Sequence, residues 1–96
     1  MAKVVVAQRA RTDLDQLIRT RGLPADTRSR VRASIEPLAS FPHVGRQLTG
    51  RWRGFRVILG PWPWVLIIYV YDEPTDTVGI AAIHDARSAS SATPES

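Results

Sequence analysis

The sequence is 96 residues long, has no cysteine, and carries 13 basic and 9 acidic side chains, so its formal net charge is +4. A chain of this length fits one small domain, and the lack of cysteine excludes a disulfide framework or a thiolate metal site. Its longest apolar run, Trp64 to Tyr71, is far shorter than the ~20 residues of a membrane-spanning helix. These features predict a soluble cytoplasmic protein with no membrane partner.

Positive charge is concentrated in one part of the chain. From Arg9 to Arg56, eleven arginines stand against four acidic residues, a local balance of +7, whereas from Val57 onward the balance is −4. The densest stretch is GRQLTGRWRGFRV, residues 45–57, which holds four arginines. Because arginine suits bidentate contact with phosphate and carboxylate groups, this stretch predicts contact with a polyanion, either a nucleic-acid backbone or an acidic protein surface.

The first part of the chain predicts a short strand and two helices. Val4 to Val6 is a β-branched run typical of an edge strand. Apolar residues then recur at helical spacing, which predicts one helix over residues 8–20 and a second over 26–40. The residues that carry this spacing are Ala10, Leu14, Leu17 and Ile18, and then Val31, Ile35 and Leu38. Pro37 lacks a backbone N–H, so the last turn of the second helix should kink or fray.

The second part predicts a sheet. Residues 55–59 alternate in character, GPWP (60–63) forms a turn, 65–71 is apolar enough for a central strand, and 78–84 is a further strand. The expected fold is α+β with the order β-α-α-β-β-β. Two N-terminal helices pack on one face of a small antiparallel sheet of three strands, in a single domain over residues 1–88. Residues 89–96 lack apolar periodicity and are expected to be disordered.

Three segments carry motifs of a known protein family. They are LASFPHVGRQLTGRWRGFRV at the helix-to-strand junction, LIIYVYD in the central strand and IAAIHDAR near the end. They include a Pro-x-x-Gly-Arg turn, a Gly-x-x-Arg strand start, a strand tyrosine and a terminal His/Arg cluster. With the element order, these motifs resemble the RelE/ParE superfamily of toxins from bacterial type II toxin–antitoxin modules, over about residues 3–88.

The resemblance implies a co-encoded antitoxin as partner and divides the possible targets. RelE-like toxins enter the ribosomal A site and cleave mRNA without a metal, whereas ParE-like toxins inhibit DNA gyrase and need no nuclease residues. RelE-like inhibition of translation, by a metal-independent endoribonuclease that acts on the ribosome and mRNA, is the leading hypothesis. A ParE-like gyrase inhibitor and a plain nucleic-acid-binding module are the alternatives.

The resemblance also indicates candidate site residues. Arg51, Arg53 and Arg56 lie where the family often carries phosphate-contacting cations, and Arg87 lies in its terminal cluster. Arginine stays protonated, so proton transfer falls to His84, ahead of Tyr69, Tyr71 or Asp85, because an imidazole titrates near pH ~6.5. The hypothesis thus has two sets of residues: catalytic His84, Arg87 and Arg56, and phosphate-binding Arg46, Arg51 and Arg53.

Two features depart from the RelE-like pattern. The start of the central strand, Trp64 to Leu66, has no arginine, and no tyrosine follows Tyr71. Both departures favour the gyrase alternative. If a strand already began at Arg51, alternation would place Arg51 and Arg53 on one face and Arg56 on the other, unless a bulge near Gly54 re-aimed one of them.

Other constellations are weaker. His43 and His84 are the only histidines, and no Gly-rich phosphate loop is present, so we expect no metal site and no small-molecule cofactor. Trp52, Trp62 and Trp64 leave three roles open: stacking on bases, closing the core, or forming a hydrophobic surface that an antitoxin covers.

Overall fold

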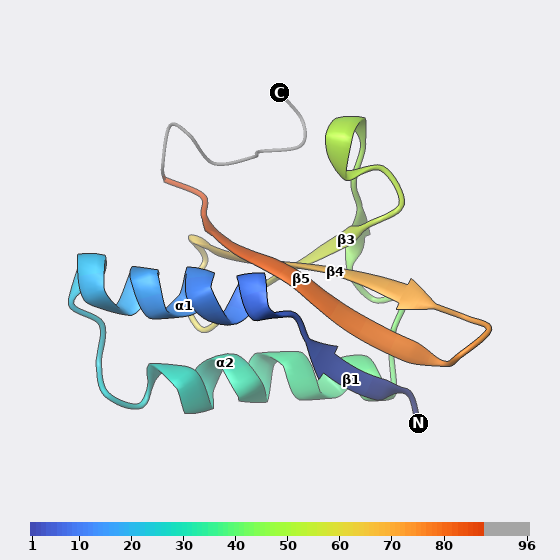
Figure 1. Cartoon of the computed structure of the whole chain (residues 1–96), viewed down its shortest axis with the longest axis horizontal. Coiled ribbons are helices and arrows are strands. Elements are labelled where there is room, and N and C mark those ends of the chain that lie inside the picture. The colour runs from blue at the N-terminus through green and yellow to red at the C-terminus, as the bar shows by residue number, and fades with distance from the viewer. Residues whose placement is uncertain (88–96) are drawn as a thin grey trace.

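The computed structural model describes residues 1–87 and contains two helices and a five-stranded mixed sheet (Figure 1). The elements are β1 (Lys3–Val6), α1 (Gln8–Arg21), α2 (Thr27–Ile35), the 3₁₀ turn η1 (Glu36–Ala39), β2 (Arg46–Gln47), the 3₁₀ turn η2 (Gly50–Trp52), β3 (Arg56–Leu59), β4 (Val65–Asp72) and β5 (Thr77–Asp85). The predicted α+β class is confirmed. The predicted disordered tail, 89–96, lies outside the described residues.

The sheet has the strand order β1-β5-β4-β3-β2 and is larger than the three strands expected. β1 pairs in parallel with β5, whereas β5, β4, β3 and β2 pair antiparallel in turn. The two-residue β2 is too short to leave a period-2 pattern in the sequence. β4 is the central strand, as its apolar run predicted.

The second helix is shorter than the expected 26–40 because Pro37 interrupts it. α2 ends at Ile35, and the chain tightens into η1, with Pro37 in its first turn. Pro37 lacks the N–H that an α-helical hydrogen bond needs at this position, and its ring collides with the carbonyl of the residue four positions earlier. Leu38 nevertheless stays buried, so the apolar spacing correctly identified it as core.

Both helices pack on the same face of the sheet, where the main core lies. Each fully buried aliphatic side chain stabilises the fold by roughly 1.5–3 kcal/mol. The buried members are Ala10, Val31, Ile35 and Leu38 from the helical layer, Val65, Ile67 and Tyr69 from β4, and Val78, Ile80 and Ile83 from β5. A smaller cluster covers the other face, formed by Leu48, Val57, Ile68 and Ala82 with Trp52, Phe55 and Leu66 packed against it.

A bulge in β5 changes which residues share a face. Ile68 pairs with Ala82, but the next residue, Tyr69, pairs with Ile80, so Ala81 is an extra residue. Side chains alternate strictly in a regular strand, and one extra residue reverses the alternation beyond it. Strict alternation along β5 would place His84 on the face of Val78 and Ile80. The bulge instead puts it on the other face, with Ala82.

The Tyr69 hydroxyl links the central strand to the turn after η1. Tyr69 is completely buried; its hydroxyl donates a hydrogen bond to the Pro42 carbonyl and accepts one from the Gly45 N–H, both at 2.9 Å. Gly45 is required for this approach, since a Cβ there would lie 2.6 Å from the Tyr69 oxygen. Burial raises the pKa of Tyr69, against the opposing hydrogen bond from Gly45 and the charge of Arg56. The phenol therefore stays protonated.

Replacing Tyr69 with Phe should lower the free energy of unfolding by about 1–3 kcal/mol, because two buried backbone groups lose their partner. Gly45→Ala should be at least as damaging, because the added methyl group collides with the phenol. Urea denaturation measures both changes. Tyr71→Phe is the matched control, since its hydroxyl bonds the exposed Asp76, and it should change stability little. Equal losses in the two tyrosine variants would contradict the anchoring role of Tyr69.

Candidate functional site

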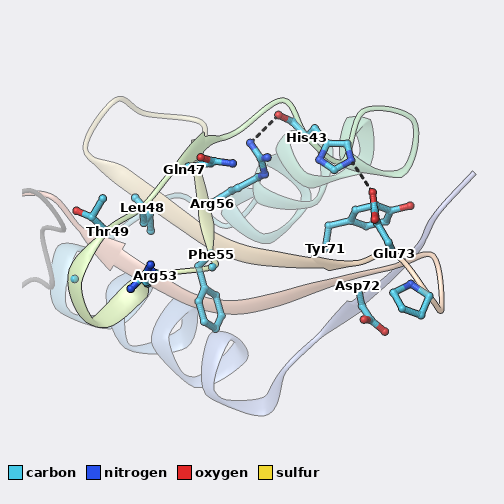
Figure 2. Close-up of a pocket in the computed structure, with 13 residues that line it drawn as sticks. His43, Gln47, Leu48, Thr49, Arg53, Phe55, Arg56, Tyr71, Asp72 and Glu73 are labelled. Carbon is cyan, nitrogen blue, oxygen red and sulfur yellow. Dashed lines mark hydrogen bonds and ion pairs between the residues drawn. The ribbon is translucent and has the colours of Figure 1, made fainter.

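A groove of about 880 Å³ lies where β3 begins and β4 ends (Figure 2). The turn after η1, the segment from β2 to the start of β3, and the turn after β4 all contribute to it. We call it the β3–β4 groove. It is lined by His43, Gln47, Leu48, Thr49, Gly50, Arg53, Gly54, Phe55, Arg56, Tyr71, Asp72, Glu73 and Pro74.

Arg56 is fixed against the turn that Tyr69 anchors. One of its terminal nitrogens donates to the carbonyl oxygens of Gly45, at 2.8 Å, and His43, at 3.1 Å. Figure 2 shows the guanidinium beside His43 and Gln47. Arg56 remains charged, but part of its hydrogen-bonding capacity is used on backbone carbonyls. Its position therefore serves the fold as well as the binding of an anion.

Aromatic and acidic side chains line the groove next to Arg56. The His43 ring meets Tyr71 edge to face, with 5.1 Å between ring centroids, and its Nε2 lies 3.8 Å from a Glu73 oxygen. A hydrogen bond to Asp76 raises the pKa of Tyr71, helped by the charges of Asp76 and Glu73. The groove therefore brings cations and carboxylates together.

Sequence reasoning missed His43 and Glu73 as members of one site. His43 belongs to the FPHVG turn and Glu73 to the DEPTD turn, and neither turn carries a motif that points to the other. They meet because the FPHVG turn is hydrogen-bonded to Tyr69 of β4, and the DEPTD turn follows the end of that strand. The usable signal is the strand tyrosine, whose hydroxyl holds the first turn against β4.

The predicted phosphate contacts are divided. All three arginines are exposed, but only Arg53 lines the β3–β4 groove; Arg46 lies on β2 and Arg51 in η2. A strand does not begin at Arg51: η2 occupies residues 50–52 and β3 starts at Arg56, so strand alternation does not apply to Arg51 and Arg53. Gly54 has φ of +92°, a conformation that favours glycine, and it redirects the chain into β3.

His84 is half-buried on the face opposite the helices. Its ring meets Trp52 edge to face at 5.8 Å, and the Arg9 guanidinium lies 5.9 Å from the Trp52 ring. Burial lowers the pKa of His84, the nearby Asp13 charge opposes that change, and Arg9 adds to it. The imidazole is therefore neutral at pH 7.

Arg87 is held by an aromatic ring and a buried carboxylate. Its guanidinium carbon lies 4.0 Å from the Trp64 ring centroid, and its Nε lies 3.4 Å from an Asp85 oxygen. Asp85, whose side chain is 5% exposed, also pairs with Arg21 of α1. Burial opposes ionisation of Asp85, but the Arg87 backbone hydrogen bond and the Arg21 pair outweigh it, so the pKa of Asp85 lies below its ordinary value.

Arg56, His84 and Arg87 are not brought together. Arg56 pairs with Tyr69, on the helical face, whereas His84 pairs with Leu66, on the other face. Arg87 follows Ala86, whose N–H bonds the Trp64 carbonyl. Trp64 lies five residues before Tyr69, which is about 17 Å of extended chain. The three residues therefore occupy both faces and both ends of the sheet.

Over residues 1–87, no group of three metal-ligating side chains is close enough to hold an ion. In the same part of the chain, the helices are too short or too polar to cross a membrane.

The pKa of His84 should be visible in its titration. Because the folded pKa lies below the unfolded value of 6.5, the unfolded chain takes up a proton first as the pH falls. The contribution of His84 to stability is therefore complete above the unfolded pKa and is lost as the pH falls through the window between the two values. NMR titration of the His84 imidazole should give a midpoint below 6.5. A midpoint above 6.5 would contradict this assignment.

Solved structures with the same fold include toxins of toxin–antitoxin systems. The chromosomal ParDE system of Pseudomonas aeruginosa matches with a TM-score of 0.69 and 13% identity, over 91% of this chain and 98% of that chain. The RelBE2 complex of Mycobacterium tuberculosis has a TM-score of 0.60 and 22% identity, over 88% and 96%. The intact RelBE complex of Escherichia coli has a TM-score of 0.65 and 12% identity, over 92% and 100%. At these identities the likeness establishes the fold.

The sequence itself establishes the family. No curated protein sequence matches it significantly. Residues 4–89 match the family described as ParE toxin of the type II toxin–antitoxin system parDE, which is nearly the whole chain. The RelE/ParE resemblance of the sequence motifs is thereby confirmed, and the chain belongs to the ParE toxin family of type II toxin–antitoxin systems.

Proposed function

We propose that this toxin arrests growth by binding DNA gyrase, as ParE-like toxins do, with no catalytic step of its own. One observation carries the proposal: the separation of Arg56, His84 and Arg87 over both faces and both ends of the sheet. Metal-free RNA cleavage needs an acid, a base and a cation around one phosphate, within hydrogen-bonding distance of the reacting atoms. The three residues do not meet this requirement, whereas inhibition by binding needs no such convergence.

The environment of each residue supports the same proposal. Arg56 donates to two backbone carbonyls, and Arg87 lies on Trp64 and pairs with Asp85. His84, neutral at pH 7, packs against Trp52. The contacts of each residue are thus explained by a structural role, without any role in catalysis.

The proposed function includes a cognate antitoxin as partner. Solved relatives are toxin–antitoxin complexes, including ParDE and RelBE assemblies. The eleven arginines between Arg9 and Arg56 suit an acidic antitoxin, because complementary charge accelerates association. Gyrase and the ribosome are both cytoplasmic, so we place the toxin in the cytoplasm.

RelE-like mRNA cleavage is the second candidate, and the β3–β4 groove is the observation that favours it. Arg53 and Arg56 supply cations there, and the His43–Glu73 pair offers an imidazole beside a carboxylate. Exposed Arg46 and Arg51 lie in the neighbouring β2 and η2 and would contact further phosphates. In this candidate the proton-transfer group is His43 rather than His84.

Pulse labelling after tightly controlled induction separates the two candidates. If gyrase is the target, thymidine incorporation should stop first, and gyrase alleles selected for resistance should restore growth. His84→Gln should keep this arrest, because a binding mechanism does not use the imidazole for proton transfer. In vitro, the toxin should inhibit supercoiling by purified gyrase.

The opposite order would overturn the gyrase proposal. If methionine incorporation falls within minutes while thymidine incorporation continues, the ribosome is the target, and His43→Gln should then abolish toxicity while antitoxin binding survives. A plain nucleic-acid-binding module would instead bind DNA in the absence of gyrase, with an affinity that falls steeply as salt increases.

A further inference from the structure

Two arginines and two tryptophans form a stack at the end of the sheet away from the β3–β4 groove. The Trp62 and Trp64 rings are nearly parallel, with an interplanar angle of 14° and centroids 5.9 Å apart. The guanidinium carbon of Arg30, from α2, lies 5.7 Å from the Trp62 ring, and that of Arg87 lies 4.0 Å from the Trp64 ring. We call Arg30, Trp62, Trp64 and Arg87 the Arg–Trp stack.

The turn that carries both tryptophans is held firmly by its backbone. The Gly60 N–H bonds the Val65 carbonyl at 2.9 Å, and the Val65 N–H bonds the Trp62 carbonyl at 3.0 Å. The Ala86 N–H bonds the Trp64 carbonyl at 2.7 Å, which joins the turn to the end of β5. Both indoles also pack against the main core. The stack is therefore ordered before any partner arrives, which reduces the entropy cost of binding.

The stack presents mainly hydrogen-bond donors to solvent. The side chains of Arg30 and Arg87 are 51% and 52% exposed. Each guanidinium already uses its Nε on a carboxylate of the chain: that of Arg30 bonds the exposed Asp26 at 2.9 Å, and that of Arg87 lies 3.4 Å from the enclosed Asp85. Further binding therefore falls to the terminal N–H groups of both guanidinium groups. Guanidinium groups and indole N–H groups donate but do not accept hydrogen bonds. A complementary partner must therefore bring acceptors, and carboxylates fit guanidinium groups best.

The residue types of the Arg–Trp stack suit a protein interface. Tryptophan and arginine are the residue types most enriched at the energetic centres of protein interfaces. Exposed Leu59 does not belong to this surface: it pairs with Leu66, on the sheet face opposite the helices, whereas both indoles pack against the main core.

We propose that the Arg–Trp stack forms the surface that docks the target, and that the surface takes a protein segment that carries carboxylates. This inference rests on the proposed function and assigns the segment to gyrase rather than to DNA. Guanidinium groups and the neighbouring indole already lie against the ring faces. A nucleic-acid base would have to displace them to stack, whereas a carboxylate binds a guanidinium edge without disturbing its contact with the ring.

The test uses the full-length toxin, produced with its antitoxin and then separated from it, and purified gyrase without DNA. Arg87→Ala and Trp62→Leu should each weaken gyrase binding on the order of tenfold or more, measured by biolayer interferometry. Both variants should retain antitoxin binding and the wild-type circular dichroism spectrum. Trp62→Leu keeps an apolar side chain beside the core, and Arg87→Ala leaves the buried Asp85 paired with Arg21.

Matched controls remove the same kinds of group elsewhere. Arg19→Ala deletes an exposed charge on α1, and Phe41→Ala deletes an aromatic ring that is 65% exposed in a turn distant from the stack in sequence; both should bind gyrase as the wild type does. Unchanged gyrase binding by the folded stack variants would overturn the inference, as would a loss confined to antitoxin binding. A loss confined to binding of a DNA duplex would also overturn it. If the wild-type toxin itself does not bind gyrase, the proposed function fails first.

Discussion

The buried hydroxyl of Tyr69 is the interaction on which the candidate site depends. Without it, the turn from Pro42 to Gly45 would lose its buried hydrogen bonds to the central strand, and the carbonyls that hold Arg56 would lose their fixed position. A polar group at 0% exposure is costly unless its hydrogen bonds are made. Here the hydroxyl both donates and accepts, so the core tolerates it, and the same bonds shape one wall of the β3–β4 groove.

The bulge at Ala81 separates two sets of residues that would otherwise share a face. Before it, the inward positions of β5 complete the core under the helices; after it, the alternation is reversed and His84 faces Trp52. The same reversal keeps Ile83 and Asp85 on the helical side, where Asp85 pairs with Arg21. The extra residue therefore lets Asp85 pair with Arg21 of α1. It also places the His84 imidazole on the face away from Arg56, with which it was predicted to act.

Much of the fold follows from periodicity, and little of the site does. Apolar spacing correctly identified α1, α2, β3, β4 and β5, because each buries one or both faces. β2 and the parallel pairing of β1 with β5 were not predicted. Two residues are too few to show a periodic pattern, and strand order does not follow from a local sequence pattern. The site depended on a bulge, a 3₁₀ turn at residues 50–52 and the pairing of two distant turns. Of these features, only the 3₁₀ turn is indicated by the sequence, through the glycines around Arg51 and Arg53.

The pairing of β1 with β5 also orders events during synthesis. Lys3–Val6 can join the sheet only when Thr77–Ile80 has been made, so the sheet remains incomplete while most of the chain is translated. Contacts between segments so distant in sequence form slowly, because closing the intervening loop costs conformational entropy. A nascent toxin of this topology therefore lacks its parallel edge strand until residue 80 has been made. An antitoxin that is already present has this interval in which to meet the chain before the sheet is complete.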